Sequence, residues 1–132
     1  MADRIKFELV SPERMLAEMD ADAVTVPGQA GDLTAMPSHA PFMTSMRPGV
    51  VTVRADGAET RYAVTGGFAE ITGESVTVLA EESIEAEAVD NAWMSERISA
   101  FEKAHESAGE ERKQATLQSL HDIRALGQML GA

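Results

Sequence analysis

Hydrophobic and polar residues alternate with a period of two through the first two thirds of the chain, a pattern typical of β-strands. Ile5, Phe7 and Leu9, for example, alternate with Lys6 and Glu8. Turn signals separate the runs, among them Pro-Gly, Asp-Gly and Gly-Gly steps. Short strands with tight turns predict an antiparallel sandwich or barrel. The predicted strands cover residues 5–9, 21–26, 50–54, 60–65, 68–72 and 76–80.

Beyond this region apolar residues recur every three or four positions, which predicts helices. Asp90 is suited to cap the first helix by accepting backbone N–H bonds. Ser107 and Glu110 have the spacing of a capping box, so a second helix is expected to start directly after Ser107. Its apolar face would consist of Leu117, Leu120, Ile123, Leu126 and Leu130. The change of period predicts a β-domain over residues 1–88 and a helical hairpin over 89–132.

Composition narrows the class of protein. The chain has 132 residues and a net charge of −11, and 22 acidic residues face 11 basic ones. This balance argues against nucleic acid or an anionic lipid surface as the main partner, because both are bound by clustered Lys and Arg. The chain has 0 cysteines, which excludes disulfides, thiolate nucleophiles and zinc–thiolate sites. The sequence also has no run of about 20 apolar residues that would predict a membrane helix.

Candidate catalytic groups do not form a recognisable site. His39, His105 and His121 share no ligand spacing, so no metal site is expected. The glycine-rich run at 27–32 lacks the Gly-Lys-Ser/Thr ending of a phosphate-binding loop and predicts a hairpin turn. Ser38 stands next to His39, and within one short loop the two cannot face each other as parts of a hydrolytic triad. We therefore expect no catalytic residue, no metal and no cofactor.

The segment Pro37-Ser38-His39-Ala40-Pro41 is bounded by two prolines. Proline lacks a backbone donor, so this loop is expected to have little regular pairing and to present its side chains outward. Two interpretations are open from composition: a rigid crossover between strands, or a contact surface for a partner.

Five segments together resemble one family, the epsilon subunit of the bacterial F-type ATP synthase. They are FELVSP, VPGQAGDLTAMPSHAP, RPGVVTV, VTGGFAEI and VTVLAE, which begin at residues 7, 26, 47, 64 and 76. The resemblance covers residues 1–90 closely and the hairpin by its layout. It implies a flattened antiparallel β-sandwich of about ten short strands followed by an antiparallel α-helical hairpin.

The resemblance also implies a function. The protein would be a non-catalytic rotor subunit of the central stalk that links the gamma subunit to the cytoplasmic loops of the c-ring and couples proton flow to ATP synthesis. It would be peripheral, at the cytoplasmic face of the bacterial inner membrane, without inserting into it. The alpha and beta subunits would be further partners of the C-terminal helices.

Two contact surfaces are expected. The ring-contacting residues that the resemblance implies are Gly31, Asp32, Ser38, His39 and Ala40. The neighbouring Pro41, Phe42 and Met43 offer apolar surface that is expected to pack on gamma. Asp32 is expected to pair with a basic group of the ring, and His39 to donate a hydrogen bond.

The start of the first helix departs from the family pattern. Many members carry Ile/Leu-Asp-x-x-Arg-Ala there, and in some of them this motif binds ATP. The matching residues here are Val89, Asp90, Trp93 and Met94. A triphosphate favours a bidentate cationic donor, which tryptophan cannot supply, so nucleotide binding is not expected. Trp93 is instead expected in the core between the helices.

The second helix carries Arg112, Lys113 and Arg124, balanced by acidic neighbours. Attraction to acidic catalytic subunits should therefore be weak, and little inhibition of ATP hydrolysis is expected. The alternative function is a free-standing β-sandwich binding module with a helical tail. Such a module usually exposes aromatic side chains on a concave face, whereas aromatic residues make up 5% of this chain.

Overall fold

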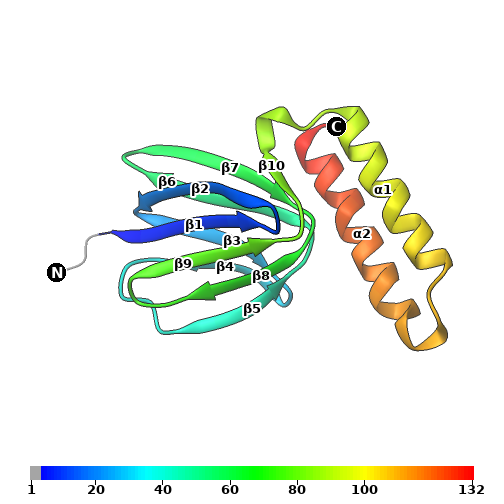
Figure 1. Ribbon diagram of the computed structural model, residues 1–132, viewed down its shortest axis with the longest axis horizontal. Helices are drawn as coiled ribbons and strands as arrows, with labels where there is room; N and C mark the ends of the chain where they lie inside the picture. Colours follow the sequence, from blue (N-terminus) through cyan, green and yellow to red (C-terminus); the bar gives the residue numbers. More distant parts are fainter. Residues whose placement is uncertain (1–3) are drawn as a thin grey trace.

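The computed structural model describes residues 4–132 and shows a β-domain followed by a helical hairpin (Figure 1). The ten strands are β1 (Ile5–Ser11), β2 (Arg14–Ala21), β3 (Ala23–Gly28), β4 (Gly31–Ala35), β5 (Phe42–Met46), β6 (Gly49–Ala55), β7 (Ala58–Val64), β8 (Gly67–Ile71), β9 (Ser75–Ala80) and β10 (Ser83–Glu85). The helices are α1 (Asn91–Glu106) and α2 (Lys113–Leu130), with short 3₁₀ turns η1 (Ala86–Ala88) and η2 (Glu110–Arg112). This arrangement confirms the predicted fold class. Neither helix of the described chain has the length and apolar character needed to cross a membrane.

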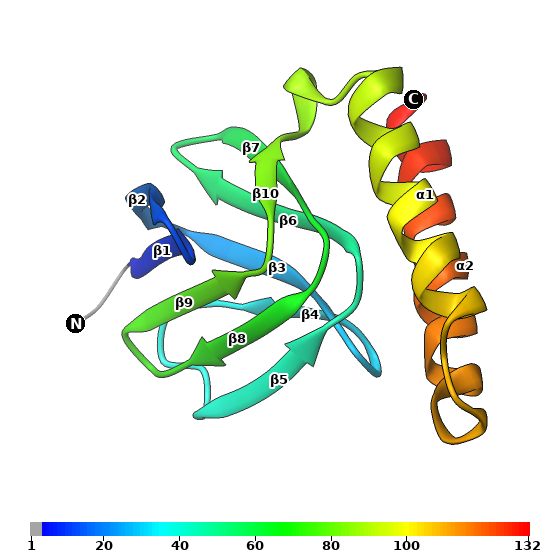
Figure 2. The ribbon, with the colours of Figure 1, turned by 45° about the vertical axis from the view of Figure 1, so that its right-hand side comes forward.

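The strands form one hydrogen-bonded sheet that folds over on itself (Figure 2). Its order is β10-β7-β6-β3-β5-β8-β9-β1-β2, and β4 pairs with β3. One pair corrects the antiparallel expectation, because β1 runs parallel to β9. A parallel pair needs a long connection between its strands, and the intervening strands of this sheet provide it.

Two glycine turns explain how the strands connect. Asp56 and Gly57 have φ angles of 53° and 77°, and they join the paired residues Ala55 and Ala58 of β6 and β7. Positive φ at both central residues is the turn geometry that a two-residue hairpin favours. Gly67 has a φ of 133°, and a Cβ there would lie 2.0 Å from the carbonyl oxygen of Leu79. The Gly66-Gly67 step therefore allows β8 to lie directly against β9.

The apolar residues pack into two clusters. The first lies inside the folded sheet and includes the fully buried Ile5, Phe7 and Leu9 of β1. The second lies between the sheet and the hairpin and consists of Ala63, Met94, Leu120, Ile123 and Leu126. The hairpin thus covers one end of the β-domain, the helix-facing end, while β1 begins at the opposite end (Figure 1).

The helix boundaries confirm one predicted cap and correct another. Asp90 caps α1, because its Oδ1 accepts a hydrogen bond of 2.8 Å from the backbone nitrogen of Trp93. The capping box predicted at Ser107 is wrong, since α2 begins at Lys113. Ser107 has φ −89° and ψ −4° and ends α1, whereas an N-cap residue takes an extended conformation. The chain passes instead through Gly109 and the 3₁₀ turn η2.

Candidate functional site

The residues predicted to contact the c-ring lie at the two ends of β4. Gly31 and Asp32 open this strand at the helix-facing end, and Ser38, His39 and Ala40 follow its other end. Within residues 4–132, β4 pairs with β3 alone, so its outer edge is open. The two groups of residues therefore lie at opposite ends of one exposed strand, β4.

Asp32 already has a partner in its own chain. Nη2 of Arg47 donates to Oδ1 of Asp32 at 2.6 Å, while Nη1 donates to the carbonyl oxygen of Gly28 at 2.6 Å. The Asp32 side chain remains 65% exposed. Arg47 was not among the site residues predicted from the sequence. It donates a hydrogen bond to the same Asp32 carboxylate that was expected to pair with a basic group of the c-ring.

The second turn is fixed mainly by its backbone. The backbone nitrogen of Ser38 donates to Gly73 at 2.8 Å, and that of His39 donates to Met36 at 3.1 Å. Nδ1 of His39 lies 2.6 Å from the carbonyl oxygen of Ala40. Since a carbonyl only accepts, Nδ1 carries the proton, and Nε2 of the neutral ring is an acceptor. The expected hydrogen bond from His39 to the c-ring stays a prediction.

An apolar face covers neighbouring strands of the sheet. Met43 of β5, Phe68 of β8 and Leu79 of β9 are 64%, 56% and 51% exposed. Phe68 and Leu79 are direct cross-strand partners, and Met43 pairs with Glu70, two residues along β8 from Phe68. Phe42, which is 50% exposed, precedes Met43 and pairs with Ile71, so it lies on the opposite face of the sheet. We call Met43, Phe68 and Leu79 the apolar face.

Met43 of the apolar face was among the contact residues predicted from the sequence. Pro41, Phe42 and Met43 are all exposed, as expected for a contact surface. Phe68 and Leu79 were missed. The signal for Phe68 was present, because it alternates in phase with Glu70, whereas the intervening Ala69 is buried.

The residues that match the ATP-binding motif of some family members have structural roles in the helical hairpin. Asp90 caps α1, and Met94 is 1% exposed in the second cluster. Trp93 is half-buried at the margin of that cluster, which corrects its expected place in the core between the helices. The guanidinium of Arg97 covers its ring, and a hydrogen bond from Arg97 to Glu82 raises the pKa of this arginine.

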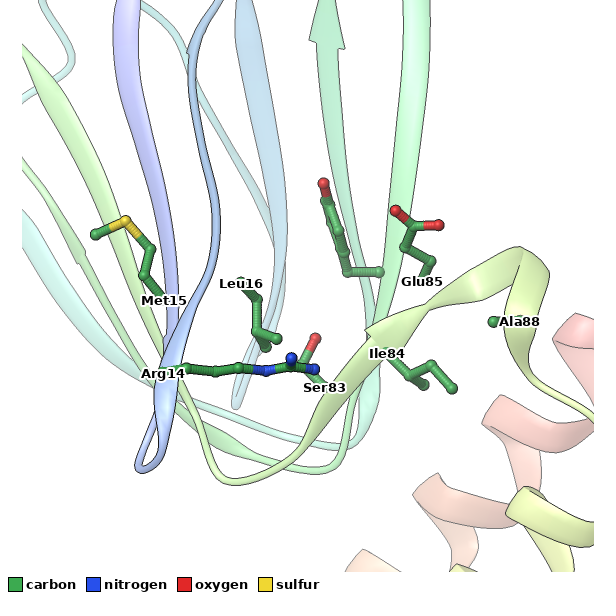
Figure 3. A pocket seen from close by; sticks show the side chains of 8 residues that line it. Arg14, Met15, Leu16, Ser83, Ile84, Glu85 and Ala88 are labelled. Atoms are coloured by element: carbon green, nitrogen blue, oxygen red, sulfur yellow. The ribbon is translucent and has the colours of Figure 1, made fainter.

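A groove of about 360 Å³ opens between β2 and β10 (Figure 3). Figure 3 shows Arg14 extending from β2 across the groove toward Ser83. Burial, with a smaller contribution from the Glu85 carboxylate, raises the pKa of Tyr62 at the wall of the groove.

Across the part of the chain that the structure describes, no three His, Cys, Asp or Glu side chains gather as metal ligands.

The comparisons with known proteins assign the family. Residues 4–86 match the family described as ATP synthase, Delta/Epsilon chain, beta-sandwich domain. The ATP synthase epsilon chain of Paracoccus denitrificans (strain Pd 1222) is 50% identical, over 99% of this chain and 93% of its own. That of Rhodobacter capsulatus is 46% identical, over 96% of each. The chain belongs to the ATP synthase epsilon chain family. The predicted resemblance is confirmed, and the free-standing binding module is not favoured.

Solved structures share the epsilon fold. A chain of the Euglena gracilis mitochondrial ATP synthase, in an OSCP/F1/c-ring structure, has a TM-score of 0.76 at 19% identity, covering 98% of this chain and 83% of its own. A chain of the Tetrahymena thermophila mitochondrial ATP synthase, in a central stalk/c-ring structure, has a TM-score of 0.55 at 15% identity, covering 66% and 70%. Family membership makes this protein a subunit of an enzyme complex and not an enzyme by itself.

Proposed function

We propose that this epsilon-family protein is a rotor subunit of a proton-translocating F-type ATP synthase, where it links gamma to the c-ring. The observation that carries the proposal is 50% identity to an epsilon chain across 99% of the chain. The fold it shares with a chain from a central stalk/c-ring structure supports the same function. In this role the protein is peripheral at the cytoplasmic face of the inner membrane and contributes no catalytic residue.

The apolar face is the surface proposed for gamma. Met43, Phe68 and Leu79 expose more than half of their side chains. Exposed apolar side chains that gather on one face mark interaction sites, and buried aromatic residues often supply much of an interface's energy. Pro41 and Phe42 are exposed at the start of β5, next to Met43 in the chain, and their contact with gamma stays a prediction.

The side of the β-domain that carries β4 is the surface proposed for the c-ring. It brings Gly31 and Asp32 to one end of an open edge strand, and Ser38, His39 and Ala40 to the other. Both turns are held by hydrogen bonds to other strands or turns. Fixed turns suit a joint that transmits torque, because a flexible contact would yield under load.

The hairpin is proposed to inhibit ATP hydrolysis little. Arg124 of α2 pairs with Glu102 of α1 at 2.8 Å, and Lys113 donates to the carbonyl oxygen of His105 at 3.1 Å. The pairing offsets the charge of Arg124, and the bond of Lys113 holds its ammonium against α1, which weakens the attraction of α2 for acidic segments of alpha and beta.

Co-expression with gamma tests the proposed function. The chain should co-purify with gamma in a fixed ratio. The double variant Phe68→Ser, Leu79→Ser should reduce the recovered complex at least tenfold, whereas Leu117→Ser, on an exposed part of α2, should not. Wild-type protein that fails to form a gamma complex would contradict the proposal.

A further inference from the structure

Two turns at the helix-facing end of the β-domain are tied together around one arginine. The backbone nitrogen of Arg47, in the β5–β6 turn, donates to the carbonyl oxygen of Pro27 at 3.0 Å. Its guanidinium donates to Gly28 and to Asp32, both at 2.6 Å, so it holds both sides of the β3–β4 turn. The backbone nitrogen of Gln29 adds a bond of 2.9 Å to Ser45 of β5.

Two glycines allow close packing here, one between the two turns and one within the β3–β4 hairpin. A Cβ at Gly49, at the start of β6, would lie 2.6 Å from Cβ of Pro27. A Cβ at Gly28 would lie 2.7 Å from the carbonyl oxygen of Gly31. The β3–β4 turn therefore has a fixed shape, and Arg47 is the side chain that connects it to its neighbour.

We propose that Arg47 is a positioning residue that holds the β3–β4 turn, and with it Gly31 and Asp32, in the shape that meets the c-ring. This inference rests on the proposed rotor function. It changes the expected role of Asp32, whose carboxylate acts through Arg47 instead of meeting a basic group of the ring directly.

The chemistry requires arginine at this position. Its planar guanidinium carries N–H donors on three nitrogens, and here Nη1 and Nη2 have different acceptors, a carbonyl and a carboxylate. An ammonium at the end of a lysine lacks this fork and cannot hold both acceptors in the same geometry. The Arg47 side chain is 28% exposed, so the contact is partly shielded from water and salt.

The test uses the intact ATP synthase in inverted membrane vesicles, with ATP-driven proton pumping measured relative to ATP hydrolysis. Arg47→Ala should lower this ratio about two- to fivefold, the range expected for losing a partly exposed charged contact. The matched control is Arg54→Ala, near the opposite end of β6. It removes an exposed ion pair, in which Nη2 of Arg54 lies 2.8 Å from Oε2 of Glu59. The control should leave the ratio unchanged.

A double-mutant cycle separates bracing from direct contact. Asp32→Ala should lower the ratio by less than Arg47→Ala, which also removes the bond to Gly28. The double variant should lose no more than Arg47→Ala alone, because the contact between Arg47 and Asp32 is already absent there. Asp32→Asn, which keeps the acceptor for Arg47, should retain most of the ratio, and Arg47→Lys should be intermediate. Additive losses, or an Asp32→Asn variant as impaired as Asp32→Ala, would overturn the bracing role.

Two further measurements distinguish a loss of the positioning role from a loss of the fold or of the rotor function. Thermal unfolding of each purified variant should show that Arg47→Ala lowers the midpoint no more than Arg54→Ala, which excludes a general loss of fold. Vesicles without the wild-type chain should lose coupling; if they pump normally, the proposed function fails. If they lose coupling and Arg47→Ala behaves like wild type, the positioning role alone fails.

Discussion

The guanidinium of Arg97 lies over the indole ring of Trp93, 4.6 Å from its centre. The same guanidinium donates to Glu82, in the turn between β9 and β10, at 2.8 Å. One arginine of the first helix thus joins an aromatic residue of that helix to a carboxylate of the β-domain. This contact explains what the tryptophan does at a position where many family members carry arginine.

Removing Arg97 should loosen the hairpin from the β-domain. Arg97→Ala loses a cation–π contact and a partly buried ion pair, together about 1–2 kcal/mol. Amide exchange in α1 should accelerate about 5- to 30-fold. The matched control is Arg124→Ala, whose partner Glu102 lies within the hairpin. Exchange in α1 that is as slow in Arg97→Ala as in wild type would show that Arg97 does not dock the hairpin.

The hairpin should owe its stability to the second cluster. Ile123 is fully buried there, so Ile123→Ala should lower the free energy of unfolding by about 2–5 kcal/mol. Leu117→Ala, at a site that is 40% exposed, should cost about 1 kcal/mol or less. Urea titration of both variants checks this difference, and equal midpoints would contradict it.

Gly67 should tolerate no side chain. Gly67→Ala places a Cβ 2.0 Å from the carbonyl oxygen of Leu79 at a φ of 133°, and the clash and strain should cost about 3 kcal/mol or more. Gly57 also has a positive φ, of 77°, but a Cβ there meets nothing within 4 Å. Gly57→Ala should therefore cost only about 1–2 kcal/mol of backbone strain. Similar thermal midpoints for the two variants would refute this account of the Gly66-Gly67 step.

Tyr62 should make stability fall at alkaline pH. Burial raises its pKa above the ordinary value of 10.0, so above pH 10 the unfolded state loses the phenolic proton while the folded state retains it. The stabilisation is complete below pH 10 and declines, by at most about 1.4 kcal/mol per pH unit, until the folded-state pKa is reached. Tyr62→Phe should flatten this decline between pH 9 and 11 in urea titrations. An identical slope in both proteins would exclude a contribution from Tyr62.

Local pattern explains most of the fold and little of its long-range contacts. β1, β6 and β9 were predicted because buried and exposed residues alternate along them. β2 was not predicted. Its apolar residues Met15, Leu16 and Ala17 are adjacent and do not alternate with polar ones, and the strand lies at the edge of the sheet with much of its surface exposed. Alternation is weakest where neither face is fully buried.

The site divides in the same way. The turn that precedes Gly31 and Asp32, and the loop that holds Ser38 and His39, followed from glycine and proline chemistry. The bond between Arg47 and Asp32 did not, because it joins residues 15 positions apart and depends on β3 meeting β5 at a single pair, Gly28 and Met46. Local periodicity does not predict such a contact between distant strands.

The most direct test of the central claim is proton pumping by ATP synthase with and without this chain. Stripped vesicles should hydrolyse ATP without acidifying, and adding back the purified protein should restore acidification. Protein truncated after Ala88 should restore it as well, with hydrolysis close to that of the full-length protein. Acidification that is the same before and after the chain is added would contradict its function as the coupling link of the rotor.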